Sequence, residues 1–289
     1  MLNRNLILFL FVFAKFHSFE GCATSKNKVT ISCKDYNLSK PMVLKLGDAL
    51  SEISGISFYP KDSSIFAISD DNGSLYKISL SKNIFTSQWK FDKPHDFEEV
   101  VLHDSTFYIL VSNGNIDAIN FSAKGDTIFR RKIKFPKADI KKNEFESLYY
   151  DEQHNGLIMI CKNCEADKKS AVSAWNFNPE TDTYLPADFS IDARSVAKKM
   201  GEEKIKLKPS AATINPLTGD VWVLASSNQL LVVTDRKGNI KEACTLDPLI
   251  YRQPEGIAFT PWGDLLISNE AGDKYGTSTL LILKPRKKI

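Results

Sequence analysis

The sequence lacks the motifs of the common catalytic and nucleotide-binding folds: it has no Gly-x-Ser-x-Gly elbow, phosphate loop or dinucleotide fingerprint. Its formal net charge is only +3 over 289 residues, and Lys and Arg are dispersed along the chain, so we expect no nucleic-acid partner. No stretch beyond the first residues is apolar and long enough to cross a bilayer. The composition, 43% hydrophobic and 25% charged, is that of an ordinary globular protein.

Cysteine is limited to five residues. Cys161 and Cys164 have the spacing of a redox motif or of half a zinc site, but a second CxxC or a His pair is absent, so we expect no zinc. The two residues follow the apolar run 157–160 and precede no clear helix. We interpret them as a pair at a strand end, either free or locally bridged.

The N-terminus has the pattern of a targeting segment. Arg4 is followed by an apolar run over residues 6–14, which suits a signal peptide and is too short to span a bilayer. Gly21 before Cys22 is similar to a bacterial lipoprotein cleavage site, although Phe19 and Glu20 depart from that motif. The predicted organisation is a signal peptide (1–22) with cleavage before a lipidated Cys22, a flexible tether (23–38) and one folded domain (39–285).

One short phrase occurs five times in the rest of the chain. Each copy begins with Glu or Ser, continues through a small or polar residue and becomes apolar, at residues 54–58, 98–102, 146–150, 210–214 and 255–259. A spacing of about 40 to 50 residues is typical of the blades of a β-propeller. The spacing is longer before the fourth copy, where residues 193–206 predict a short helical insertion.

The strand pattern predicts how the propeller closes. Short β-rich runs alternate with polar turns that contain Gly and Pro, four runs to a copy, as expected for four-stranded antiparallel blades. Only three runs follow Glu255, so the last blade is one strand short. Residues 42–46, which alternate in polarity, could supply its outer strand. We therefore predict an all-β fold with five blades, closed by an N-terminal strand that protects the sheet edges.

A family resemblance rests on Glu-Ile-Ser-Gly-Ile-Ser-Phe (52–58), Phe-Glu-Glu-Val (97–100), Phe-Glu-Ser-Leu (145–148), Lys-Pro-Ser-Ala-Ala (208–212) and Gln-Pro-Glu-Gly-Ile-Ala-Phe (253–259). In this order the segments resemble the SdiA-regulated family of bacterial five-bladed propellers, which is distantly related to NHL-repeat and phytase-like propellers. The resemblance implies an exported or membrane-attached envelope protein with a calcium site and no established enzymatic activity. Ser210 departs from it, because blade four has Ser in the Glu position, so any ring of metal ligands is incomplete there.

The repeated acidic position is the candidate functional site. The first strand of a propeller blade lines the central channel, so Glu98, Glu146 and Glu255 would converge there, and Glu52 could reach the same place. Carboxylates in a narrow space repel one another and need a cation, raised pKa values or basic partners. An all-oxygen site suits calcium better than zinc. We predict that Glu52, Glu98, Glu146 and Glu255 bind calcium.

Other interpretations of these residues stay open. Each Glu could instead hydrogen-bond the backbone of a neighbouring blade, the group could form a substrate site without a cation, or the ion could be magnesium. Asp70, Asp71 and Glu270 end second strands and could also be ligands, although turn chemistry alone accounts for them. His95, three residues before Glu98, is the one candidate general base near the channel, and a surface or capping role explains it more simply.

From these observations we predict an exported, monomeric protein of the cell envelope, periplasmic or anchored to a membrane through Cys22. It would bind an unidentified small molecule or envelope protein. One alternative is a metal-dependent hydrolase of phosphoesters, esters or lactones, and another is a purely structural interaction module. No catalytic residue can be assigned from the sequence.

Overall fold

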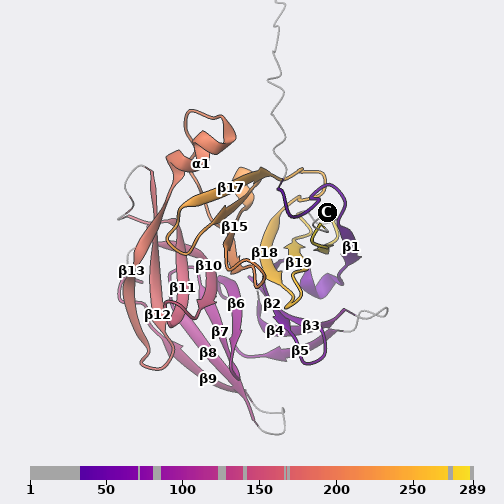
Figure 1. Ribbon diagram of the computed structural model, residues 1–289. Coiled ribbons are helices and arrows are strands. Elements are labelled where there is room, and N and C mark those ends of the chain that lie inside the picture. The colour runs from indigo at the N-terminus through magenta and orange to yellow at the C-terminus, as the bar shows by residue number, and fades with distance from the viewer. Residues whose placement is uncertain are drawn as a thin grey trace, which may run out of the picture.

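Five four-stranded antiparallel sheets surround a common centre in the computed structural model of the chain (Figure 1). The structure describes residues 33–70, 72–80, 86–122, 128–138, 142–165, 167, 170–272 and 276–286. The predicted signal peptide with Cys22 lies outside these residues, as does Asp71. Among the residues described, no helix is long and apolar enough to cross a membrane.

In four of the blades the strands follow one another in the chain and in the sheet. Blade one contains β2 (Ile53–Tyr59), β3 (Ser64–Ser69), β4 (Asn72–Ser79) and β5 (Thr86–Lys90). Blade two contains β6 (Phe97–His103), β7 (Thr106–Val111), β8 (Ile116–Phe121) and β9 (Ile128–Ile133). Blade three contains β10 (Glu144–Asp151), β11 (Gly156–Asn163), β12 (Ala171–Asn178) and β13 (Thr183–Asp192). Blade four contains β14 (Ala211–Ile214), β15 (Val221–Ala225), β16 (Leu230–Thr234) and β17 (Ile240–Thr245).

Blade five joins the two ends of the chain. Its sheet order is β1-β20-β19-β18, so the first strand of the fold is the outer strand of the last blade. These strands are β18 (Pro254–Phe259), β19 (Leu265–Asn269), β20 (Thr279–Leu283) and β1 (Met42–Lys45). Leu44 is opposite Leu280 in the antiparallel pairing of β1 with β20. The predicted five-bladed propeller, closed by an N-terminal strand, is confirmed.

The apolar core consists of five clusters, each lying between two neighbouring blades. Between blades one and two, for example, the rings of Phe66 and Phe107 pack with centroids 4.5 Å apart. Strands such as β3, β15 and β19 are buried along their whole length, because both faces of their sheets are covered. The inner strands contact one another in the order β2, β6, β10, β14, β18 and back to β2, which encloses the channel.

The predicted insertion before blade four is helix α1 (Ala193–Met200). The side chain of Asp192 accepts a hydrogen bond from the backbone N–H of Arg194 at 3.0 Å and caps the first turn. The helix is shorter than the predicted segment because Gly201 adopts a left-handed conformation, with φ of 67°, and ends it. In the described part of the chain, two short 3₁₀ helices, η1 (Asp48–Leu50) and η2 (Ser226–Asn228), complete the elements.

The end of the predicted tether is packed against the propeller. Cys33, Tyr36 and Leu38 are buried, and the Tyr36 hydroxyl donates to the Gly263 carbonyl at 2.6 Å. Cys33 also forms a disulfide with Cys244 in blade four. The part of the predicted tether from residue 33 to 38 therefore belongs to the folded body, because its apolar side chains are buried there. Residues 23–32 lie outside the described part of the chain.

Candidate metal centre

The repeated Glu lies at a β-bulge at the start of its inner strand. In β6 the pairing with β7 skips Glu98, in β10 the pairing with β11 skips Glu146, and in β18 the pairing with β19 skips Glu255. A β-bulge leaves one residue outside the ladder and changes the direction of its side chain. The same irregularity in β2 falls at Ser54 and Gly55, so blades one, two, three and five have irregular pairing at the start of the inner strand, whereas β14 of blade four pairs with β15 without a shift.

A second set of side chains faces this ring from the second strands of the blades. In each blade, one residue near the end of the second strand lies opposite the start of the inner strand. The next residue in the chain is the member of this set. In blades one to five they are Asp70, Ser112, Lys162, Ser226 and Glu270. Blades one and five therefore add two carboxylates to the mouth, whereas blade three adds an ammonium group.

Burial and mutual repulsion perturb the carboxyl groups at the mouth. Burial raises the pKa of Glu98 to about 10, and the negative charges of Glu146 and Asp96 add to the effect. Burial likewise raises the pKa of Glu270 to about 9, with repulsion from Glu255 and other carboxylates of the cluster. These groups are electrostatically coupled neighbours, as the convergence of the repeated positions predicts.

Lys162 offsets part of this negative charge. Its ammonium group forms ion pairs with Glu146 and, at 3.3 Å, with Glu144. Burial opposes the charge of Lys162, but the hydrogen bond to Glu146 and the nearby carboxylates raise its pKa above the usual value. The pKa values of Glu146 and Glu255 are raised by burial to about 7, less than those of Glu98 and Glu270, and Lys162 acts to lower both. Glu255 also accepts a hydrogen bond from Ser226.

Three carboxylates of the cluster come close enough to share one ion. Glu52, Asp70 and Glu270 each offer an oxygen, and these oxygens lie within 4.8 Å of one another. Ligands of calcium bind at about 2.3–2.6 Å, so oxygens on opposite sides of the ion are roughly 5 Å apart. The spacing, the oxygen chemistry and the excess of negative charge therefore fit a hard divalent cation such as calcium.

The structure groups the predicted ligands differently from the sequence analysis. Glu52 belongs to the group of three, whereas Glu98, Glu146 and Glu255 surround it as charged neighbours. Asp70 and Glu270, for which the sequence favours a turn role over a ligand role, complete the group with Glu52. The signal that identifies them is their equivalent place after the second strands of blades one and five. The metal role of the predicted Glu residues stays a prediction.

The channel continues beyond the acidic mouth as a cavity of about 200 Å³, lined by all five inner strands. Glu99 lies in its wall and is fully buried, with its Oε1 accepting from the backbone N–H of Val100 at 3.0 Å. For its Oε2 no hydrogen-bond partner is found among the residues that the structure describes. Burial raises the pKa of Glu99 well above its usual value, so the repeated phrase brings a second acidic residue into the channel wall.

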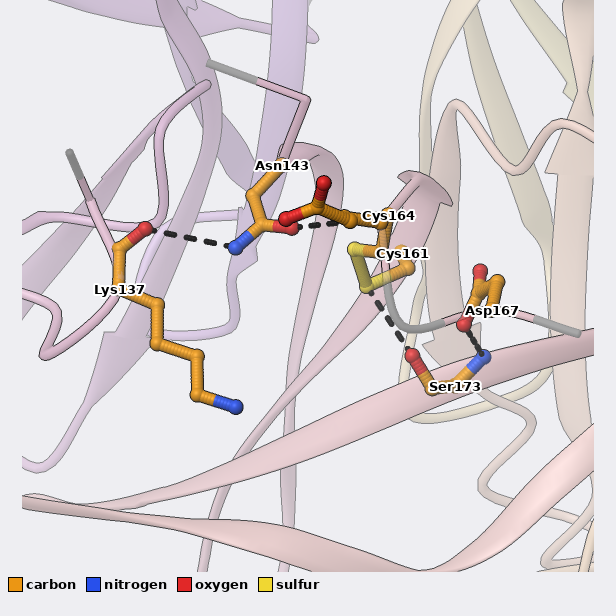
Figure 2. The surroundings of a disulfide bond; sticks show 7 residues. Lys137, Asn143, Cys161, Cys164, Asp167 and Ser173 are labelled. Atoms are coloured by element: carbon orange, nitrogen blue, oxygen red, sulfur yellow. Dashed lines mark hydrogen bonds between the residues drawn. A yellow bond between two sulfur atoms is a disulfide. The ribbon is translucent and has the colours of Figure 1, made fainter. Parts of the chain in front are cut away.

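The cysteines of the described region form two disulfides, Cys33–Cys244 and Cys161–Cys164. Figure 2 shows the second, where the Ser173 hydroxyl lies 3.3 Å from the Cys161 sulfur. The predicted pair at a strand end is thus locally bridged. Both cysteine pairs have a carboxylate nearby, but oxidised sulfur does not offer the thiolate that zinc requires.

His95, the candidate general base, is exposed, and its ring contacts the edge of Phe97 with centroids 5.7 Å apart. This environment is that of a surface residue. Among the described residues the cluster thus offers carboxylates and the Lys162 ammonium group, and carboxyl groups of this kind can bind a cation or transfer protons.

A sequence model of the SdiA-regulated family matches residues 31–274 of the chain. This span contains the first four blades and most of the fifth. No curated protein matches the sequence.

Several solved structures have a similar fold. Regucalcin from Agrobacterium tumefaciens, described as a calcium-binding protein, is 15% identical, covers 87% of this chain and 95% of its own, and has a TM-score of 0.51. A glucose dehydrogenase is 12% identical, covers 84% and 99%, and has a TM-score of 0.54. The PQQ-bound aldose sugar dehydrogenase of Streptomyces coelicolor is 13% identical, covers 86% and 99%, and has a TM-score of 0.50. At these identities the similarity shows the fold alone.

Proposed function

The chain belongs to the SdiA-regulated family of β-propellers, and we propose that it is an exported protein of the cell envelope that binds calcium at the acidic mouth of its channel. In this proposal the propeller is a binding or interaction protein, and the bound ion forms part of the surface that it presents.

The observation that supports the calcium site is the group formed by Glu52, Asp70 and Glu270, whose oxygens lie within 4.8 Å of one another. Glu255 is close enough to raise the pKa of Glu270 further, so the site has more negative charge than three carboxylates alone. A divalent cation would relieve this repulsion. Regucalcin, whose fold is similar, is itself a calcium-binding protein, which agrees with the proposal.

Calorimetric titration of the mature protein with calcium, magnesium and zinc tests the site. We expect calcium to bind at one site and more tightly than magnesium or zinc. Glu52→Gln and Glu270→Gln should each weaken calcium binding by about tenfold or more, the equivalent of about 1.4 kcal/mol. Glu180→Gln, an exposed residue in the turn between β12 and β13, is the matched control and should change nothing. Absence of calcium binding by the wild-type protein would refute the proposal.

A cleft beside the cluster supports the binding role. It has a volume of about 530 Å³, Glu270 forms part of its wall, and Lys45 and Arg252 line it. A ligand that contacts both the bound ion and these basic side chains would carry a carboxylate or phosphate group. Calcium-dependent binding of inorganic phosphate, weakened by Arg252→Gln, would support an anionic ligand.

Export is supported by the leader pattern together with the two disulfides, since disulfides persist in oxidising compartments outside the cytosol. The proposed anchor is a lipid on Cys22. Metabolic labelling with a radioactive fatty acid should mark the wild-type protein and not Cys22→Ser. The variant should appear in the soluble envelope fraction, and equal membrane association of both proteins would contradict the anchor.

A metal-dependent hydrolase of phosphoesters, esters or lactones is the second candidate. It is favoured by the pKa values of Glu146 and Glu255, which at about 7 suit general acid–base catalysis near neutral pH. Turnover of a phosphoester or lactone should then require calcium and be lost in Glu255→Gln with the fold retained. Calcium binding without any turnover would leave the binding protein as the function.

A further inference from the structure

The lysine of the acidic cluster lies inside a disulfide loop. Lys162 is flanked by Cys161 and, two residues later, Cys164, and these two cysteines are bonded to each other. The same lysine forms ion pairs with Glu144 and Glu146 at the channel mouth. The lysine that pairs with carboxylates of the candidate metal centre thus lies in a loop closed by a disulfide, a bond that redox chemistry can make and break.

The end of β11 positions this lysine. Cys161 pairs with Phe145 and Asn163 pairs with Glu144, so Lys162 is left out of the pairing, one step along the ladder from the bulge that contains Glu146. Immediately after Asn163 the chain leaves the sheet, and the disulfide ties Cys164 back to the strand. The bond therefore fixes the backbone on both sides of Lys162.

Beyond the disulfide, hydrogen bonds hold the described residues of the segment (Figure 2). The backbone N–H of Glu165 donates to the Asn143 side chain at 3.3 Å, and Asp167 accepts from the backbone N–H of Ser173 at 3.1 Å. Such exposed or half-buried bonds are weak restraints compared with a covalent bond. Reduction of the disulfide would consequently loosen the end of β11.

The two disulfides differ in their access to solvent. Cys33 and Cys244 are both fully buried in the core. Cys161 is also buried, but Cys164 is half-buried and lies between the exposed residues Asn163 and Glu165. Of the four cysteines, Cys164 is therefore the one that a thiol in solution would reach first, whereas the disulfide of the core is buried.

We propose that the Cys161–Cys164 disulfide is a thiol–disulfide exchange site for a dithiol, and that its reduction strengthens calcium binding by releasing Lys162 from the carboxylates. A thiolate of the dithiol attacks the sulfur of Cys164 and expels Cys161 as a thiolate. The second thiol of the dithiol then attacks the mixed disulfide and expels Cys164. Two electrons and two protons pass to the cysteines, and the dithiol leaves as a disulfide.

The increase in affinity follows from charge. In the oxidised protein the ammonium group of Lys162 occupies the field of Glu98, Glu146 and Glu255, and it opposes the approach of another cation. After reduction has loosened the end of β11, the ammonium group of Lys162 can move toward solvent. A calcium ion is then attracted by carboxylates whose charge Lys162 no longer offsets. The coupling between two such sites is typically 5- to 150-fold, and we expect a gain on the order of tenfold.

The first experiment measures which disulfide a dithiol reaches. The folded mature protein is exposed to increasing dithiothreitol and alkylated, and the modified cysteines are identified by mass spectrometry. We expect Cys161 and Cys164 to be labelled at concentrations that leave Cys33 and Cys244 bonded. Labelling of all four cysteines together, or of Cys33 and Cys244 first, would overturn the proposal.

The second experiment measures calcium affinity in both redox states by calorimetry. Selective reduction, and the Cys161→Ala/Cys164→Ala variant, should each raise the affinity about tenfold. Lys162→Gln should bind calcium tightly in both states and lose the response to dithiothreitol. Lys241→Gln, which removes a lysine paired with Asp220 on blade four, is the matched control and should keep the response. Equal affinities in the oxidised and reduced wild-type protein would overturn the proposal.

This inference rests on the proposed calcium site, and a third measurement separates the two. A double-mutant cycle with Glu146→Gln and Lys162→Gln, measured on the stability of the metal-free protein, gives the interaction free energy between the two side chains without any ion. We expect this coupling to fall on reduction of Cys161–Cys164. If neither the oxidised nor the reduced protein binds calcium but the coupling falls on reduction, the proposed calcium site is refuted and the release of Lys162 is supported. If the coupling is unchanged, the release of Lys162 is refuted.

Discussion

Gly55 of blade one leaves the space in which the carboxyl group of Glu99, from blade two, is buried. A β-carbon at Gly55 would overlap Oε1 of Glu99 and would lie 2.5 Å from its Cα and 2.7 Å from the backbone nitrogen of Val100. The second position of the repeated phrase therefore fixes how closely two inner strands approach each other. The positions of the Glu99 side chain and of the Glu99–Val100 backbone therefore require that residue 55 has no side chain.

Gly55→Ala should therefore destabilise the protein strongly. Because the overlap involves backbone atoms, the blades have to move apart, and we expect the free energy of unfolding to fall by about 3 kcal/mol. Urea denaturation checks the change. Gly47→Ala is the matched control, since a β-carbon there meets no atom within 4 Å, and it should be neutral or slightly stabilising. Equal stability of the two variants would contradict the expected overlap.

The stability of the metal-free protein should decrease as pH rises from about 5 to 8. Unfolding restores carboxyl groups to a pKa near 4.3, whereas burial holds the pKa of Glu146 and Glu255 at about 7 and that of Glu270 at about 9 in the folded protein. The folded state binds more protons than the unfolded state in this range. The protein is therefore most stable, with respect to these groups, below pH 4, and the free energy of unfolding falls as pH rises through the folded pKa values.

Calcium should reverse this dependence on pH, because the ion replaces the protons on the carboxylates. Urea denaturation in EDTA and in calcium, at pH 5 and at pH 8, measures both effects. Carboxylates with lowered pKa, such as that of Asp92 beside Arg130, take up protons only at more acidic pH. They therefore do not change the pH dependence of stability between pH 5 and 8. Stability that rises with pH in EDTA would show that the cluster is not protonated in the folded protein.

The two disulfides should differ in their contribution to stability. Cys33–Cys244 closes a loop over 211 residues, whereas Cys161–Cys164 closes one over only 3. Restriction of the unfolded chain grows with loop length, so replacing Cys33 and Cys244 by Ala should cost about 2–5 kcal/mol and replacing the other pair should cost less. Thermal unfolding of the two double variants checks the order, and a larger loss for the short loop would contradict it.

Deletion of residues 1–46 should expose an unprotected sheet edge. The deletion removes β1, so the hydrogen-bonding groups of β20 that face Leu44 and its neighbours would lose their partners. We expect a lower melting temperature and self-association, measured by size-exclusion chromatography. Deletion of residues 1–32 keeps β1 and the disulfide cysteine and is the matched control, which should stay monodisperse.

The blade architecture could be read from the sequence because one phrase repeats in every blade. The copies at Ser54, Glu98, Glu146, Ser210 and Glu255 each mark the start of an inner strand. The closing strand followed from counting, since three strands after Glu255 required a fourth. The helix was foreseen but extended too far, because the left-handed Gly201 that ends it is not distinguished by periodicity.

The candidate site was foreseen only in part. The repeat points to Glu98, Glu146 and Glu255, but not to Asp70, Lys162 and Glu270, which lie at or just after the ends of second strands and become neighbours only through the strand register. Their residue types differ from blade to blade, so similarity between copies cannot reveal them. The disulfide of Cys33 with Cys244 was also missed, because residues separated by 211 positions meet only when the ring closes.

Closure of the ring by β1 and β20 sets the order in which folding can be completed. The strand that emerges first from the ribosome or a translocation channel pairs with the strand that emerges last, so blade five cannot form on a partly delivered chain. Contacts between such distant segments slow folding, because the intervening chain has to be ordered before they form. Under the proposed export, the propeller would close only after its C-terminal strands had crossed the membrane.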